Sequence, residues 1–131
     1  MGGSGAGPAP AGDPAGRAVT DETRQLVDYC LDRLEGWRVS TRRLFGTTAL
    51  YRDGLVFALV WRGAVYFKVD AESRADYEAA RSHPFTFTTR KGEEAVVKSY
   101  WLAPDEVVED DETFLIWAER ACLAAREAER R

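Results

Sequence analysis

Residues 44–70 read LFGTTALYRDGLVFALVWRGAVYFKVD, and this segment limits the folds that the chain can adopt. Two short turn signals, Asp53-Gly54 and Arg62-Gly63, divide it into runs rich in β-branched and aromatic residues. The middle run, Leu55–Trp61, is entirely apolar, which is typical of a strand in the centre of a sheet. The segment therefore predicts an antiparallel meander with strands over 44–51, 55–61 and 64–69.

Helical patterns lie on both sides of this meander. Leu26, Cys30 and Leu34 recur at helical spacing after a possible N-cap at Thr20. Asp70, and later Asp110 or Asp111, can cap two further helices. The remaining predicted elements are a first helix from residue 20, a second over 71–82, strands over 85–89 and 96–102, and a last helix to about 129.

This order of elements, α-β(3)-α-β(2)-α, predicts an α+β fold with an antiparallel sheet and helices in two layers. The length of 131 residues suits one domain. Within residues 1–18, 14 positions are Gly, Pro or Ala, so too little apolar surface is available there to offset the entropy of ordering. We therefore expect a flexible tail over 1–18 and a folded domain over 19–131.

Composition excludes collagen, a coiled-coil rod and a wholly disordered chain. Apolar residues make up 45% of the chain and charged residues 31%, which is ordinary for a globular domain. The longest apolar run is far shorter than a membrane helix, and the start of the chain lacks the pattern of a signal peptide. These features predict a cytoplasmic protein with no membrane partner.

The hairpin register predicts which strand residues share a face. With two-residue turns, one face is nearly all apolar and should lie under the helices: Phe45, Ala49, Tyr51, Val56, Ala58, Val60, Val65, Phe67 and Val69. The other face carries Gly46, Thr48, Leu50, Phe57, Leu59, Trp61, Tyr66 and Lys68. We interpret Phe57, Leu59, Trp61, Tyr66 and Lys68 as a surface for a protein partner or a second copy of the chain. A slip of one residue would exchange the two faces.

A local basic edge offers a second hypothesis. The formal net charge is −4, yet residues 33–98 hold twelve Lys or Arg against eight Asp or Glu. Arg42 and Arg43 precede the first predicted strand, and Lys91 and Lys98 belong to the second hairpin. Cations with aromatic residues nearby can bind nucleic acid, although a solvated edge that protects strand ends is the favoured interpretation. Direct nucleic-acid binding therefore stays an alternative that is not favoured.

Residues with catalytic or ligand-binding chemistry are sparse. His83 is the only histidine, and Cys30 and Cys122 form no metal-binding or redox pair, so buried thiols are favoured over a disulfide. The acidic run over 105–112 lacks the ligand order of a calcium loop and is interpreted as a solvated loop before the last helix. We expect no catalytic residue, metal or cofactor, and we keep an enzyme with an unrecognised site as a third hypothesis.

Several phrases, taken in order, resemble the N-terminal domain of the TfoX/Sxy competence-regulator family. They are Leu44-Phe45-Gly46, Leu50-Tyr51-Arg52-Asp53-Gly54, Phe57-Ala58-Leu59, Val65-Tyr66-Phe67-Lys68-Val69-Asp70, Pro84-Phe85-Thr86-Phe87, Ser99-Tyr100-Trp101-Leu102-Ala103-Pro104 and Trp117-Ala118. The resemblance covers about residues 26–125. It implies a two-layer α-β(3)-α-β(2)-α fold similar to type III secretion chaperones and YjbR-like proteins. It also implies a role in regulating competence genes, with no catalytic residues to transfer.

The chain departs from the family pattern in two places. Thr47, Thr48 and Ala49 follow Phe45-Gly46, where the family often has further glycines. The sequence also ends after the last predicted helix, which leads us to expect a stand-alone domain. The function predicted from the sequence is a non-enzymatic, cytoplasmic bacterial regulatory module that acts by protein–protein contact.

Overall fold

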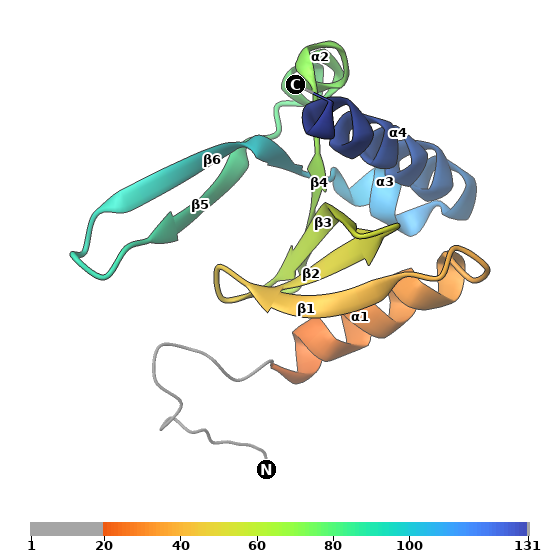
Figure 1. Ribbon diagram of the computed structural model, residues 1–131, viewed down its shortest axis with the longest axis horizontal. Coiled ribbons are helices and arrows are strands. Elements are labelled where there is room, and N and C mark those ends of the chain that lie inside the picture. Colours follow the sequence, from red (N-terminus) through yellow and green to blue (C-terminus); the bar gives the residue numbers. More distant parts are fainter. Residues whose placement is uncertain (1–19, 131) are drawn as a thin grey trace.

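The computed structural model describes residues 20–130, so the predicted tail over 1–18 lies outside the described residues. The elements in chain order are α1 (Asp21–Arg33), β1 (Ser40–Leu44), β2 (Thr47–Arg52), β3 (Leu55–Trp61), β4 (Ala64–Lys68), α2 (Ala71–Ala79), β5 (Pro84–Thr88), β6 (Glu94–Leu102), α3 (Asp105–Glu109) and α4 (Asp111–Glu129). Six strands form one antiparallel sheet in the order β1-β2-β3-β4-β6-β5, which confirms the predicted α+β class. Helices α1 and α4 lie against one side of the sheet (Figure 1).

The first predicted strand is in fact two strands. Phe45 and Gly46 form a turn with φ of 57° and 78°, and β1 pairs with β2 across it. The same pattern of two positive φ values recurs at Asp53-Gly54 and Arg62-Gly63, so three tight turns connect a four-stranded meander. The prediction that Gly46 lies inside a strand is wrong because this glycine supplies the left-handed backbone of the turn.

The predicted register is correct in β4 and wrong in β2. Leu50 pairs with Ala58 but Tyr51 pairs with Val56, so Phe57 is an extra residue in β3, a β-bulge. The bulge turns both Phe57 and Ala58 toward the helices. Phe57 is fully buried there and lies 6.1 Å from Trp37 between ring centroids, so its predicted place on the opposite face is wrong.

The bulge also exchanges the faces of β2 relative to the prediction. Leu50 belongs to the core under the helices, whereas Ala49 and Tyr51 lie on the opposite face. Thr48 pairs with Val60 and so shares the helix side with it. A single inserted residue thus reverses the face on which every side chain of the neighbouring strand lies, because strand side chains alternate with a period of two.

The sheet curls over its second face, which we call the aromatic face. Its buried residues are Ala49, Leu59, Tyr66, Phe85 and Tyr100. Phe45 stacks on Phe87 with 5.5 Å between ring centroids, although β2 and β5 would lie about 19 Å apart across four spacings of a flat sheet. The curl places Leu59 at 0% and Tyr66 at 6% exposure, so the prediction that both lie on an open surface is wrong.

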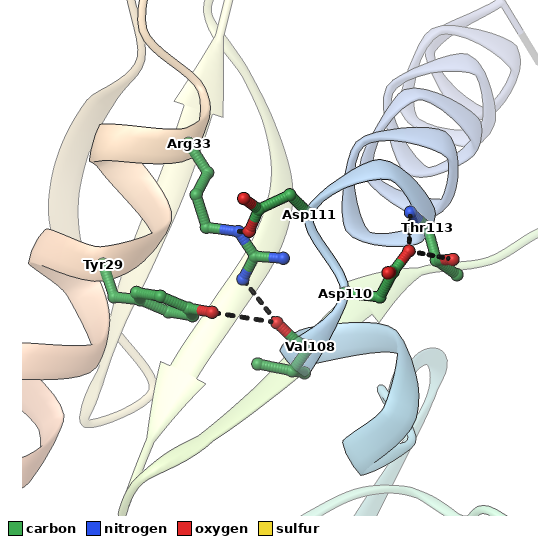
Figure 2. A network of polar contacts seen from close by, with 6 residues as sticks. All are labelled: Tyr29, Arg33, Val108, Asp110, Asp111 and Thr113. Atoms are coloured by element: carbon green, nitrogen blue, oxygen red, sulfur yellow. Dashed lines mark hydrogen bonds and ion pairs between the residues drawn. The ribbon is translucent and has the colours of Figure 1, made fainter.

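A buried arginine connects the first helix to the last two. Arg33 has 8% of its side chain exposed, and its guanidinium lies over the rings of Tyr29 and Phe114, at 4.4 and 4.0 Å from their centroids. Figure 2 shows it beside Tyr29. Its Nη1 donates to the carbonyl of Val108, and its Nε lies 3.0 Å from Oδ1 of Asp111. This side chain therefore holds α1 against the junction of α3 and α4.

Side-chain caps fix the starts of the helices, as predicted at three positions. Thr20, Asp70 and Asp110 each accept a hydrogen bond from a backbone N–H three residues later. The acidic run over 105–112 forms α3 and the first turn of α4, so its interpretation as a loop is wrong. Carboxylates are stabilised near helix N-termini, which explains why this run can be helical.

Replacing Arg33 with methionine tests the connection between helices. We expect Arg33→Met to lower the free energy of unfolding by about 2 kcal/mol, because it removes a buried hydrogen bond and two cation–π contacts. The control, Arg74→Met, removes an exposed ion pair to Glu78 and should change stability by about 0.5 kcal/mol or less. Urea unfolding measures both values, and equal effects of the two variants would contradict the role given to Arg33.

The cap of α2 predicts part of the acid sensitivity of the fold. The Ser73 N–H bonded to Asp70 lowers the pKa of that carboxyl, so its stabilising effect is present above the unfolded pKa of about 3.9 and lost as pH falls below it. Asp70→Asn keeps an acceptor oxygen but cannot titrate. We expect nearly unchanged stability at neutral pH and a shallower loss below about pH 4. Thermal unfolding measured across pH tests this, with exposed Asp32→Asn as the control. The prediction is contradicted if Asp70→Asn, like the control, loses stability with falling pH as steeply as the parent protein.

Candidate functional site

A groove lies at the end of the sheet that carries the β1–β2 and β3–β4 turns. This groove has a volume of about 730 Å³. Its lining comes from the start of α1, from the two turns with adjacent residues of β1, β2 and β3, and from β5 with Glu94 of β6. The residues that matter for its chemistry are Arg43, Phe45, Trp61, Arg62, Phe87 and Glu94, together with the hydroxyls of Thr86 and Thr88.

Phe45 is the most unusual residue of the groove. It is 48% exposed, and it occupies a turn position with φ of 57°, where glycine, asparagine and aspartate are preferred. A left-handed backbone costs a residue of this kind about 1 kcal/mol or more. The ring stacks on Phe87. Phe87 in turn stacks on Phe85, which makes an edge-on contact with Trp61. A strained and exposed aromatic residue is thus held at the mouth of the groove.

The charged side chains of the groove are mainly basic. Its lining holds two arginines, Arg43 and Arg62, and one carboxylate, Glu94. Arg43 Nε donates to the carbonyl of Thr47 at 3.3 Å, and the Arg62 guanidinium lies 4.5 Å from the centroid of the Trp61 ring. Within residues 20–130 neither arginine forms an ion pair. Both guanidinium groups therefore keep donors for an incoming acceptor.

The residues predicted as a partner surface do not form one surface. Trp61 is partly exposed and lines the groove, whereas Leu59 and Tyr66 are buried and Phe57 lies on the helix side. Lys68 is half-buried on the aromatic face, with Nζ 5.0 Å from the centroid of the Tyr100 ring. Burial lowers the pKa of Lys68 and raises that of Tyr100 to about 12.

The predicted basic edge is likewise divided. Arg42 and Arg43 are consecutive in β1 and so point to opposite faces, with Arg42 over the ring of Tyr51 and Arg43 in the groove. Lys91 lies in the turn between β5 and β6, and Lys98 is exposed on β6. Arg43 is thus the one member of this predicted set that lines the groove.

The groove residues that the sequence analysis does not predict as site residues include Phe45, Arg62, Thr86, Phe87, Thr88 and Glu94, and Phe45 is the most informative of them. The signal was present, because Phe45-Gly46 and Asp53-Gly54 are separated by the length of one strand, as two successive hairpin turns of a meander are. An apolar residue at the first position of such a turn is rare, which hides the turn inside an apparently continuous strand. Recognising it would have placed Phe45 at a strand end with an exposed ring.

The described residues hold no obvious catalytic centre. Among them, no group of three or more His, Cys, Asp or Glu residues could hold a metal ion. Cys30 and Cys122 are both free and buried, as the sequence predicts, and burial raises the pKa of Cys30 to about 12. The His83 ring is exposed, with Nδ1 3.1 Å from the carbonyl of Pro84. In the part of the chain that the structure describes, no helix combines the length and apolarity needed to cross a membrane.

Comparison with known proteins identifies the family. The family model described as TfoX N-terminal domain matches residues 31–125, a span that includes the groove turns, β5 and most of α4. The chain belongs to the TfoX N-terminal domain family. The resemblance seen in the sequence is thereby confirmed. The TfoX N-terminal domain is not a known enzyme family, and no curated protein matches the chain.

The two cysteines provide a test of the buried thiols. Because burial raises the pKa of both Cys30 and Cys122, almost no thiolate should be present in the native protein at pH 8. We expect a thiol reagent to label neither residue until the chain unfolds, and then to label two. The raised pKa also predicts stability that is present at neutral pH and lost as pH rises above about 9. Fast labelling of the native protein would contradict this and favour the enzyme hypothesis.

Proposed function

We propose that this TfoX N-terminal domain is a non-enzymatic regulatory module that acts by contact with another protein, and that the groove is its contact site. The observation that carries the proposal is Phe45, which is exposed although its backbone conformation is unfavourable for phenylalanine. Backbone strain that a fold keeps at an exposed residue is commonly associated with function. The likeness to competence regulators supports a regulatory role.

The groove has the composition of a protein contact. Aromatic residues and arginine contribute most of the binding energy at protein interfaces, and here Phe45, Trp61 and Phe87 lie beside Arg43 and Arg62. The aromatic rings are already packed against one another, so little side-chain entropy is lost when a partner covers them. In contrast, the aromatic face is closed by the curl of the sheet and offers little area for a partner.

Replacing Phe45 with asparagine separates function from folding. Asparagine suits the turn, so the relief of strain and the loss of the ring stack should nearly cancel, with a change in unfolding free energy of about 1 kcal/mol or less. We expect Phe45→Asn to lose partner proteins in quantitative affinity capture from the source cells, and to lose the effect of the wild-type protein on transcript levels.

The matched control is Ile116→Asn. Ile116 is 54% exposed on α4, on the helix side of the molecule and outside the groove lining. The control should keep the captured proteins and the transcript pattern. If Phe45→Asn behaves like Ile116→Asn in both measurements, the groove is not the contact site. Light scattering of the wild type and both variants shows whether the contact is with a second copy.

A further inference from the structure

Both edges of the sheet border the groove, β5 through Thr86, Phe87 and Thr88 and β1 through Arg43. The sheet order leaves β1 and β5 at its two edges. Thr89 N–H donates to the carbonyl of Glu93 across the turn, so the backbone N–H of Thr89 points toward β6. Hydrogen-bonded and non-bonded pairs alternate along an antiparallel ladder, so Thr86 and Thr88 direct their N–H and C=O groups away from β6. The outer side of β5 can therefore pair with another strand.

The two edges differ in their protection. β1 carries Arg42 and Arg43 in its five residues, and charged side chains on an edge strand oppose pairing with another chain. β5 reads Pro-Phe-Thr-Phe-Thr, without a charge and with residues that favour strands. Its proline stands at the first position, where it does not block the rest of the edge. β5 is thus the receptive edge.

We propose that β5 accepts an extended acidic segment of another protein as an added strand; this rests on the function proposed above. A strand added to β5 would lie about 4.8 Å from it and would therefore run along the groove wall that Thr86, Phe87 and Thr88 form. Alternate side chains of the added strand would face opposite sides. One set would cover Phe87 and Phe45, and the other would face Arg43 and Arg62.

Charge identifies the partner's chemistry. The groove lining has two arginines against one carboxylate, and the hairpin tip adds Arg90 and Lys91 against Glu93. An added strand with apolar residues on one side and carboxylates on the other would match both surroundings. A second copy matches poorly, because its own β5 carries no carboxylate and its β1 is basic.

The probes are two seven-residue peptides, one alternating valine and glutamate and the other alternating valine and lysine, each with a fluorescent label. We expect fluorescence anisotropy to show that the full chain binds the glutamate peptide, more weakly as salt increases, and does not bind the lysine peptide. Thr86→Pro removes one outward N–H without touching the ladder to β6, and should weaken binding at least about tenfold. The matched control, Thr41→Pro, removes the equivalent outward group of β1 and should bind like the wild type.

Two further results complete the test. The double variant Arg43→Glu, Arg62→Glu should bind the lysine peptide in place of the glutamate peptide, which supports the proposal even if Thr86→Pro folds poorly. No binding of either peptide by the wild type, or equal binding of both peptides, would overturn it. So would self-association that Thr86→Pro abolishes, because the occupant would then be a second copy. Loss of partner capture in Phe45→Asn without any peptide binding would leave the proposed function standing while this inference fails.

Discussion

Apolar side chains on both faces of the sheet constrain this fold, because helices cover only one of the faces. The helices bury the side that carries Leu50, Phe57, Val60 and Phe67. The other side is covered by the sheet itself, which curls until residues from distant strands, such as Phe45 and Phe87, touch. An open sheet would leave Leu59 and Phe85 in water, at a cost of about 1.5–3 kcal/mol for each large side chain. The curl also creates the groove.

The sequence predicts the elements better than their faces. Turn chemistry at Asp53-Gly54 and Arg62-Gly63, together with the caps Thr20 and Asp70, correctly indicates where strands and helices begin and end. These signals are local, so neighbouring residues determine them. The bulge at Phe57 is different, since it depends on how β2 and β3 fit together over the helices. No residue pattern within one strand reveals that fit, and the predicted faces of β2 were exchanged as a result.

The groove was missed for a related reason. Leu59 and Tyr66 were assigned to an open surface because a two-layer fold normally leaves one face of its sheet uncovered. The contacts that bury them join β3 and β4 to Phe85, which lies at the far edge of the sheet. Such contacts arise only from the curvature of the whole sheet. Trp61 is partly exposed, but it lies in the groove with Phe45 and Phe87 and not on one surface with Leu59 and Tyr66.

The same curvature explains why the two edges of the sheet differ. Bringing the β1–β2 turn against Phe87 leaves β5 beside a hollow that Arg43 of β1 also lines, and both arginines of β1 are exposed along the other edge of the sheet. A curled sheet that does not close must keep two unpaired edges, and each is a risk for aggregation unless it is protected or used. Charge protects β1. Because β5 has no charge and borders the strained Phe45, its unprotected edge is better explained as a site that binds a partner strand.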